Sequence, residues 1–441
     1  MTVTTRFAPS PTGNLHVGNL RAALHNWMFA RAQGGRFLLR IDDTDGERSE
    51  ESYVEAIRAD LAWLGLTPDG EARQSARFDR YEARFAELKA AGRVYPAYET
   101  AQELELKRKV LLGRGLPPVY DRSALALTDE DRARFEAEGI RPHWRFRLDH
   151  DAMIEWNDLI RGPQRFDPKT MSDPVVRRAD GSWLYLLPSV IDDVDMAISH
   201  VVRGEDHVSN TASQLQMFAA LGAAAPDFAH EALLTGAEGK LSKRLGSLGI
   251  GHFRGVGIEP QALIALLARL GTSDPVEPLV DPAPLIASFD FARFGRAPAR
   301  FDEEELAQLN ARIVHQLGFD AVKDRLPAGM NEAGWEAIRP NLSIVADAAD
   351  WWQVVEGPIE PMIAEEDQAF IAQAAGIAET IDWANPWPEL TGALKEATGR
   401  KGRALFLPLR LALTAREHGP DMAALLPLIG KDRALDRLRS G

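Results

Sequence analysis

One stretch decides the fold: RFAPSPTGNLHVGN, residues 6–19. Residues 3–7 are largely apolar or β-branched and lead into a Pro/Ser/Gly turn, which predicts a short buried strand. Residues 20–31 carry an apolar stripe, which predicts a helix. A helix N-terminus attracts anions, and His16 and Asn19 add side-chain donors in the turn. The stretch therefore predicts a phosphate site, although it is neither the dinucleotide fingerprint nor the lysine-bearing phosphate loop.

A second charged stretch, Lys240-Leu241-Ser242-Lys243-Arg244, follows Leu233-Leu234-Thr235-Gly236. Two lysines in a Gly-flanked loop are usually solvated charges. Here the loop follows an apolar strand, and lysine is a compact cation on a flexible stem. We therefore interpret the segment as one that can close over a polyphosphate.

The two stretches resemble the HIGH and KMSKS motifs of class I aminoacyl-tRNA synthetases, in the forms typical of the glutamyl branch. Residues 399–410, GRKGRALFLPLR, resemble a C-terminal motif of bacterial glutamyl-tRNA synthetases. The resemblance covers essentially the whole chain. It implies a glutamate–tRNA ligase, which activates L-glutamate with ATP to glutamyl-adenylate, releases pyrophosphate and transfers glutamate to the 3′ end of tRNA(Glu).

The resemblance also implies roles for individual residues. The catalytic set is His16, Asn19, Lys240 and Lys243. The ATP-binding set is Ser10, Thr12, Gly13, His16, Gly18, Asn19, Leu233, Leu234, Lys240, Ser242, Lys243 and Arg244. The glutamate-binding set is Arg6, Ala8, Ser10, Asp42, Tyr185, Ser189 and Arg203.

Glutamate and glutamine are nearly isosteric, so a binding site separates them by charge. A guanidinium pairs well with the side-chain carboxylate and poorly with the neutral amide. Arg6 on the first strand and Arg203 at the end of a later strand are placed to converge on one crevice. Two positions depart from the family pattern: Asp42 replaces the usual Glu, and Ser189 stands where many relatives have Asn.

The alternation of predicted strands and helices indicates an α/β fold plus an α region. Strands are expected at residues 36–41, 143–148 and 198–203, and helices at 50–64, 77–91, 209–221 and 260–270; residues 175–185 are expected to form a hairpin. We expect a Rossmann-like parallel-sheet catalytic domain (1–80 and 188–237), interrupted by an α+β acceptor-stem-binding insertion (81–187). A stem-contact region with the lysine loop (238–320) and an all-α anticodon-binding domain (321–441) would follow.

The composition narrows the possible cofactors and location. The chain has no cysteine, which excludes disulfides and thiolate metal sites. Some family members bind zinc in the insertion through cysteines just after a Tyr-Pro pair, but here Ala97-Tyr98-Glu99 follow it, so we expect no zinc and an insertion that folds on its apolar core alone. The expected cofactors are ATP and the Mg²⁺ it carries. No apolar run long enough for a membrane helix and no signal pattern occur, so we expect a cytoplasmic protein, and by resemblance a monomer.

The net charge of −14 argues against a simple nucleic-acid binder, but its distribution is uneven. Residues 341–390 contain ten Asp and Glu and no Lys or Arg, whereas residues 395–441 contain ten Lys and Arg against five acids. The basic terminus fits phosphate contacts and a solvated helical face equally well. Trp351, Trp352, Trp383 and Trp387 are expected to be core residues rather than base-stacking platforms.

Four other functions are compatible with parts of this pattern. A truncated paralogue that glutamylates a tRNA base ends soon after the lysine motif. A glutamine-specific enzyme usually opens with Pro-Glu-Pro-Asn instead of Pro9-Ser10-Pro11-Thr12. A catalytically weak regulatory protein would not need intact His16 and Lys243, and a small adenylyltransferase lacks the helical extension. The sequence does not decide whether tRNA(Gln) is also charged, or which residues read the anticodon.

Overall fold

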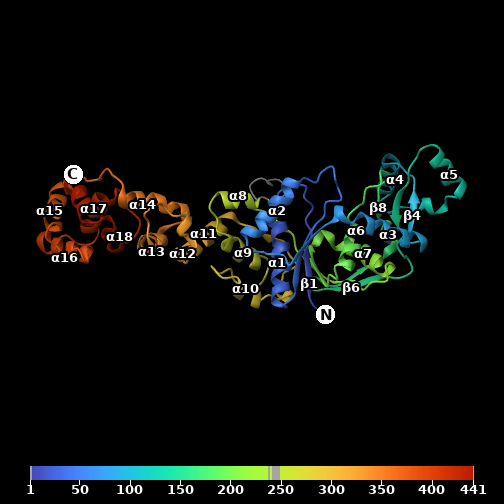
Figure 1. Ribbon diagram of the computed structural model, residues 1–441, viewed down its shortest axis with the longest axis horizontal. Helices are drawn as coiled ribbons and strands as arrows, with labels where there is room; N and C mark the ends of the chain where they lie inside the picture. The colour runs from blue at the N-terminus through green and yellow to red at the C-terminus, as the bar shows by residue number, and fades with distance from the viewer. Residues whose placement is uncertain (1, 237–238, 241–248, 441) are drawn as a thin grey trace. The chain divides into compact units, whose positions relative to one another are not determined.

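The computed structural model describes residues 2–236, 239–240 and 249–440, with the backbone alone at 239 and 240. The chain divides into two compact units (Figure 1). The first comprises Met1–Phe253, Ile264–Val276 and Asp281–Asp302, and the second Arg254–Leu263, Glu277–Val280 and Glu303–Gly441. The finer division into five segments remains a prediction.

The first unit contains the predicted parallel sheet, in two adjoining parts. Its strands, in spatial order, are β3 (Gly70–Arg73), β2 (Arg36–Ile41), β1 (Thr4–Phe7), β9 (His200–Gly204) and β10 (Asp227–Glu231). The two parts meet where the backbone N–H of Ser199 donates to the carbonyl of Thr4 at 2.9 Å. Strand order reverses between β1 and β9, and ligands of such sheets bind beyond the carboxyl ends of the strands at this switch point.

Helix α1 (Val17–Ala32) packs against β1, β2 and β9. Its predicted stripe is buried, with Leu20, Leu24 and Met28 each 1% exposed. The helix begins three residues earlier than predicted, because His16 caps it. The other helices of this part are α2 (Glu51–Trp63), α6 (Leu186–Asp195) and α7 (Val208–Ala220).

The chain between β3 and α6 is mixed α+β, as predicted. Its elements are α3 (Phe78–Ala90), β4 (Val94–Ala97), α4 (Ala101–Gly113), α5 (Asp129–Ala137), β5 (His143–Phe146), β6 (Ile154–Asp158), β7 (Gly162–Phe166) and β8 (Val175–Arg177). The predicted hairpin is confirmed, since Arg177 bridges Trp183 and Gly181 has a φ of +90°. The sequence predicted neither α4 nor the β6–β7 hairpin.

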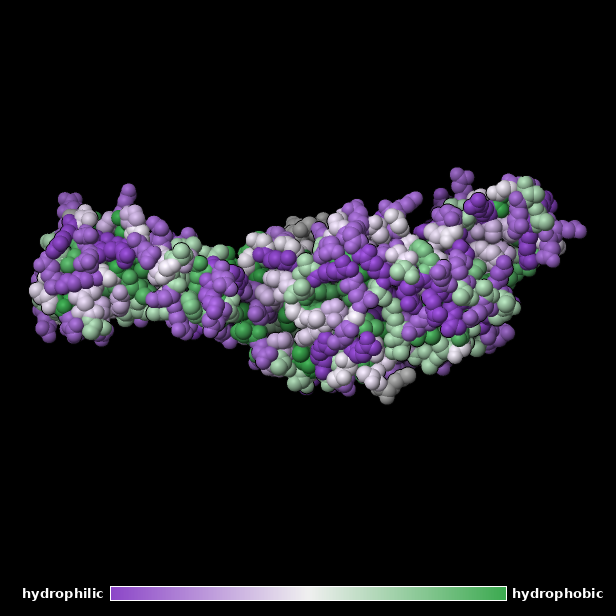
Figure 2. Space-filling view, in the orientation of Figure 1, coloured by the Kyte–Doolittle hydropathy of each residue, from purple (hydrophilic) through white to green (hydrophobic). Residues whose placement is uncertain are grey.

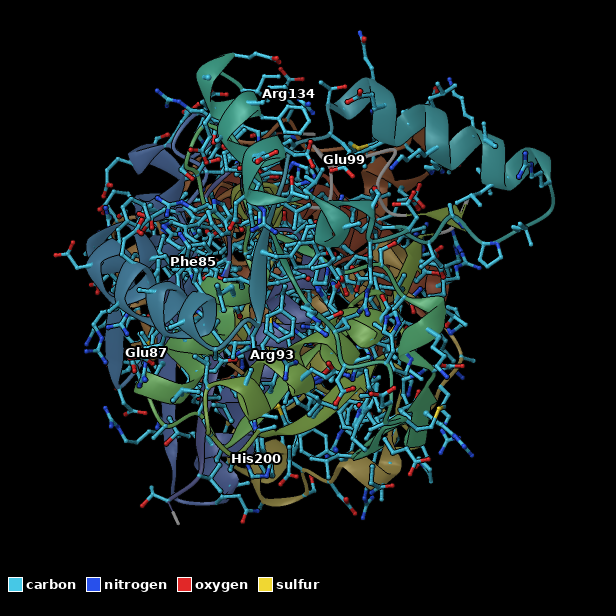
Figure 3. All side chains as sticks on the ribbon, turned by 90° about the vertical axis from the view of Figure 1, so that its right-hand side faces the viewer. Phe85, Glu87, Arg93, Glu99, Arg134 and His200 are labelled. Carbon is cyan, nitrogen blue, oxygen red and sulfur yellow. The ribbon has the colours of Figure 1, made fainter. Side chains whose placement is uncertain are left out.

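Polar contacts help to hold this α+β part. Asp173, buried to 1% exposure, accepts hydrogen bonds from the Tyr95 hydroxyl and Arg122, each at 2.6 Å. Near α4, Glu99 accepts from the Tyr120 hydroxyl at 2.8 Å. Figure 3 labels Glu99 in this region, above Phe85 of α3. These contacts add to an apolar cluster of Tyr95, Ala97 and Ala124 in the same part.

The segment around the lysine stretch forms a small sheet. β11 (Leu234–Gly236) pairs with β12 (Gly239–Lys240) and with β13 (Ala299–Arg300). The helices α8 (Ile250–Gly255), α9 (Pro260–Arg269) and α10 (Ala283–Ala287) follow. Residues 262–268 of α9 are all buried, in agreement with a helix that is apolar nearly all round.

The second unit is helical from residue 303 onward. Its helices are α11 (Glu303–Val314), α12 (Phe319–Val322), α13 (Glu332–Ile338), α14 (Ala348–Glu356), α15 (Gln368–Ala378), α16 (Pro386–Thr398), α17 (Arg403–Thr414), α18 (Met422–Ile429) and α19 (Lys431–Arg439). Trp351 and Trp352 are each 8% exposed, which confirms their predicted core position. Trp383 and Trp387 are half-buried.

Several basic residues near the C-terminus contact the protein itself. Arg437 is buried and donates to the carbonyls of Leu413 and Val354, each at 2.7 Å. Arg400 pairs with Asp367. The visible face mixes hydrophilic and apolar residues (Figure 2), and within the described residues no helix combines the length and the apolarity that a membrane span needs.

Candidate active site

His16 occupies the N-cap of α1, at the end of the loop that follows β1. Its Nδ1 accepts hydrogen bonds from the backbone N–H groups of Gly18 at 3.1 Å and Asn19 at 3.4 Å. Since Nδ1 accepts, the neutral ring carries its proton on Nε2. Burial lowers the pKa of His16, which favours this neutral form. His16 therefore offers a neutral N–H donor rather than a positive charge.

Asn19 completes the cap and keeps its own donor. Its Oδ1 accepts from the backbone N–H of His16 at 3.5 Å. Its Nδ2 has no acceptor within the described part of the chain. Between the two residues, a Cβ on Gly18 would lie 3.0 Å from Cε1 of His16. Glycine at this position therefore leaves the imidazole in place.

The loop before His16 is held by backbone hydrogen bonds to Pro9, Pro11 and Leu15 and is exposed at several residues between them. The carbonyl of Pro9 accepts from the backbone N–H of Asp42 at 2.9 Å. Ser10 and Thr12 are exposed, Ala8 is half-buried, and a Cβ on Gly13 would meet nothing within 4 Å. This loop thus leaves room for a ligand next to the predicted phosphate site.

The lysine stretch lies partly outside the described residues. Ser242, Lys243 and Arg244 are among the undescribed residues, and Lys240 is described only as the backbone partner of Thr235 in the β11–β12 pair. Of the residues before the stretch, Leu233 is 45% exposed and Leu234 is 8% exposed.

The described chain resumes after the lysine stretch at Gly249, next to the histidine turn. Gly249 forms a β-bridge with His16, and the N–H of Ile250 donates to the carbonyl of Leu15 at 3.1 Å. The chain five residues beyond the lysine motif therefore lies against the histidine turn.

Arg40 on β2 is fully buried and organises a network of charges. Its Nε and Nη2 donate to the two carboxylate oxygens of Asp42 at 2.7 and 3.1 Å, and its Nη1 donates to Oδ1 of Asp193 at 2.7 Å. Nε of Arg6 donates to the same Asp193 oxygen at 3.2 Å. The Nη atoms of Arg6 have no acceptor among the described residues, so they remain available to a ligand.

The two departures from the family pattern contact the same guanidinium. Besides Asp42, Ser189 accepts a hydrogen bond at Oγ from Nη2 of Arg40 at 2.9 Å. Burial raises the pKa of Asp42 to about 6, although the charges of Arg40 and Arg6 favour its ionised form. Burial therefore disfavours the charged form of Asp42, and the contacts with arginine favour it.

Arg203, near the carboxyl end of β9, is a buried cation held by neutral groups. Its Nη2 donates to Thr211 at 2.6 Å and to Gln214 at 2.7 Å, and its Nε donates to Nε2 of His230 at 3.3 Å. No carboxylate within the described residues forms a salt bridge with it. Burial lowers its pKa to about 10, and the nearby Arg6 charge adds to this effect. Such a cation is well suited to bind an anionic ligand.

Tyr185, directly before α6, completes the set of predicted glutamate-site residues. Its hydroxyl lies 3.3 Å from Nδ1 of His207, and burial raises the pKa of Tyr185. Burial, followed by the charge of Arg203, lowers the pKa of His207 to about 4. His207 is therefore uncharged near neutral pH.

The structure brings most of the predicted glutamate site together. Arg6 is close enough to Arg203 and Asp42 to lower the pKa of both. Tyr185 is close enough to Arg203 to raise its pKa. These side chains come from β1, the end of β2, the start of α6 and β9, which surround the switch point of the sheet.

Sequence reasoning missed the residues that hold the site residues in place. They are Arg40, Asp158, Asp193, Thr211, Gln214 and His230. One signal was present in the sequence: the pair Asp192-Asp193 inside an otherwise apolar helix is an unusual place for two acids.

No resident metal site is formed by the part of the chain that the structure describes, since no group of three or more His, Asp or Glu side chains is arranged to hold an ion. The donors around His16 are N–H groups, which bind phosphate oxygens rather than metals. This chemistry fits a Mg²⁺ ion that is held mainly by the phosphates of a nucleotide.

Comparison with known proteins identifies the family. Residues 2–308 match the model of the tRNA synthetases class I (E and Q), catalytic domain. The chain belongs to this family. Residues 335–441 match the anticodon binding domain, which agrees with the two-part architecture of a class I synthetase.

Individual synthetases of this family are similar along the entire chain. Glutamate–tRNA ligase 1 of Rhizorhabdus wittichii is 71% identical, over 99% of both chains. Glutamate–tRNA ligase 2 of Sphingopyxis alaskensis is 70% identical, over 100% of this chain and 99% of its own. The crystal structure of a glutamate tRNA ligase from Elizabethkingia meningosepticum, in complex with its amino acid, superposes with a TM-score of 0.88 at 28% identity, over 100% of this chain and 99% of that one. The resemblance to the glutamyl branch is confirmed.

Proposed function

We propose that this protein is a glutamate–tRNA ligase. It activates L-glutamate with ATP to glutamyl-adenylate and pyrophosphate, and transfers the glutamyl group to the 3′ end of tRNA(Glu). The observation that carries the proposal is Arg203, a buried guanidinium that pairs with no carboxylate of the described residues, at the switch point where the phosphate-type turn of His16 also begins. The full-length similarity to glutamate–tRNA ligases supports the same activity.

In the first step, the α-carboxylate of glutamate attacks the α-phosphorus of ATP. This chemistry needs positioned donors and positive charge more than a covalent nucleophile. Nε2 of His16 and Nδ2 of Asn19 supply neutral donors, and Lys240 and Lys243 supply positive charge from the lysine stretch. Backbone and side-chain groups of Ser10, Thr12, Gly13, Gly18, Leu233, Leu234, Ser242 and Arg244 complete the proposed ATP site. Mg²⁺ arrives on the nucleotide and neutralises its phosphates.

Glutamate is selected by charge. Arg203 and the Nη groups of Arg6 face the carboxylates of the amino acid, with Tyr185 beside them. Asp42 pairs with the ammonium group, while Ser189 helps to hold Arg40 behind it. Ala8 and Ser10 line the same end of β1. Glutamine binds poorly because its amide leaves a buried guanidinium without a counter-charge.

In the second step, the 2′-hydroxyl of the terminal tRNA adenosine attacks the acyl carbon, and AMP leaves. The tRNA is proposed to lie along a stem-contact region and the helical anticodon-binding region. Lys395, Lys401 and Arg403 are exposed and form no ion pair with the described residues, so they are the basic side chains best placed for phosphate contacts. We propose that the active form is a monomer.

ATP–pyrophosphate exchange with each amino acid, with and without tRNA(Glu), tests this function. We expect exchange with glutamate alone, and only when tRNA is bound, as is general for glutamyl enzymes of this family. Exchange with glutamine, or none under any condition, would contradict the assignment.

A further inference from the structure

A buried pair of residues behind Arg203 has no role in the function described so far. His230 on β10 is fully buried, and its Nδ1 lies 2.5 Å from Oδ2 of Asp158, the last residue of β6. The other carboxylate oxygen, Oδ1, accepts three backbone N–H groups: those of Ile160 at 3.0 Å, Arg161 at 2.9 Å and His230 at 3.1 Å. Asp158 is thus a rigidly held acceptor, 1% exposed.

This arrangement determines which ring nitrogen of His230 carries the proton. A carboxylate only accepts, so Nδ1 must donate to Asp158. Nε2 is then left with its lone pair, and it faces Nε of Arg203 at 3.3 Å and the Thr211 hydroxyl at 2.9 Å. The guanidinium N–H donates to this lone pair. A proton on Nε2 would place two N–H groups against each other.

A neutral imidazole anchors Arg203 without cancelling its charge. The remaining anchors, Thr211 and Gln214 on α7, are also uncharged. A carboxylate in place of any of them would compete with the ligand for the guanidinium. Nη1 of Arg203 has no acceptor among the described residues, so the anchored side leaves one edge of the guanidinium for a ligand.

We propose that Asp158 and His230 are positioning residues for amino-acid recognition: Asp158 fixes the Nδ1–H tautomer of His230, and the free Nε2 orients the Arg203 guanidinium toward the side-chain carboxylate of glutamate. The proposal rests on the proposed function. Under this proposal, selection of glutamate depends not only on Arg203 but also on Asp158 of β6 and His230 of β10, which act through Arg203 and not by contact with the substrate.

The surrounding charges are consistent with a neutral His230. The titratable or charged groups near it are Asp158 on β6, Arg161 just beyond it, Arg203 on β9 and His207 before α7. Burial lowers the pKa of His230; the hydrogen bond to Asp158 opposes this shift, and the charge of Arg203 adds to it. The imidazole is therefore neutral over the working range of a neutral-pH enzyme.

The nearly isosteric change Asp158→Asn tests the proposal. The three backbone N–H groups hold the amide oxygen at the Oδ1 position, so the NH₂ group faces Nδ1. The His230 proton must then move to Nε2, where it opposes Arg203. We expect the KM for glutamate to rise by about 10- to 100-fold, because a displaced binding group costs that much, while the KM for ATP changes less than twofold. Discrimination against glutamine should fall by a similar factor.

His230→Asn provides a second variant with the same expected result. Asparagine can keep a donor toward Asp158 but has no acceptor within reach of Nε of Arg203. The matched controls are Asp227→Asn and His200→Asn. These residues form a His–Asp pair at 3.6 Å at the amino ends of β9 and β10, the strands that carry Arg203 and His230, and His200 is labelled in Figure 3. The control variants should keep both KM values.

The outcomes separate this proposal from the proposed function. No glutamate-dependent exchange by the unaltered protein contradicts the function itself. If the unaltered protein shows normal exchange, two results overturn the positioning role. One is a KM for glutamate in Asp158→Asn equal to that of its control, and the other is an equal change in the KM values for glutamate and ATP. Should both variants fail to fold, ¹⁵N-histidine NMR of the unaltered protein decides: an Nδ1–H tautomer at His230 supports the proposal, and an Nε2–H or doubly protonated ring overturns it.

Discussion

At the scale of single residues, three arginines differ in what they are paired with. Arg40 donates to Asp42 and Asp193, Arg6 shares Asp193, and Arg203 has only neutral partners among the described residues. Pairing with protein carboxylates fits a structural role for Arg40, whereas the neutral partners of Arg203 are the reason we propose it as a binding group. This distinction is invisible in the sequence, where all three are arginines on strands.

Arg203→Lys should raise the KM for glutamate by about two orders of magnitude, with little change in the KM for ATP. A lysine keeps the charge but loses the planar donors that reach Thr211 and a ligand at once. Steady-state exchange kinetics measure both constants. Arg58→Lys, on the exposed face of α2, is the matched control; equal behaviour of the two variants would place the determinant elsewhere.

Asp42 should make glutamate binding depend on pH. Its pKa is raised to about 6, so the folded protein takes up a proton at Asp42 as the pH falls through this value, and the charge that pairs with the ammonium disappears. The KM for glutamate should therefore rise below about pH 6. In Asp42→Asn, the KM should be high and nearly flat over the same range. An identical pH profile for both proteins would contradict this role.

At the scale of elements, local pattern was sufficient where one face of a helix or strand is apolar. α1, α2 and α7 were predicted within a few residues from apolar residues that repeat with the helical period, and β2 was predicted as a short apolar run, which is buried on both faces. α4 was not predicted, because it has no buried residue from which an apolar stripe could be recognised. The β6–β7 hairpin was missed because its five-residue strands are mostly polar. The contacts of Asp158 could not be predicted, since they join β6 to a strand about seventy residues later.

His16 caps α1 and is also the proposed catalytic donor, and two substitutions separate these two roles. Asparagine caps helices well but lacks the Nε2–H donor, so His16→Asn should retain the stability of the protein while kcat falls by about 10²- to 10³-fold. His16→Ala should lose a comparable factor in kcat and about 1 kcal/mol of unfolding free energy as well. Urea denaturation and exchange kinetics measure the two effects. Normal kcat in His16→Asn would exclude a catalytic role.

At the scale of the whole molecule, several basic residues near the C-terminus of this acidic chain contact the protein itself. Arg400, Arg437 and Arg439 contact protein groups, while Lys401 and Arg403 form no ion pair or hydrogen bond with the residues that the structure describes. The net charge of the chain is therefore a poor guide to tRNA binding. Exposed cations that form no ion pair with the described residues are a better guide to where phosphates bind.

Lys401→Gln with Arg403→Gln should weaken tRNA(Glu) binding and leave the KM for glutamate and ATP unchanged at saturating tRNA. Removing two phosphate contacts should lower the slope of log affinity against log salt by about 2. Fluorescence titration at several salt concentrations measures this slope. Arg439→Gln, whose cation pairs with Glu379, is the control. An unaltered slope would show that this face does not contact phosphate.

The bridge between Gly249 and His16 ties the chain beyond the lysine motif to the N-terminus of α1. Gly249 lies six residues after Lys243, and a fully extended chain of that length spans about 20 Å. Covalent length alone therefore bounds the separation between the Lys243 backbone and Gly249. For the proposed function, this bound ties the cation of one motif to the turn that holds the imidazole of the other.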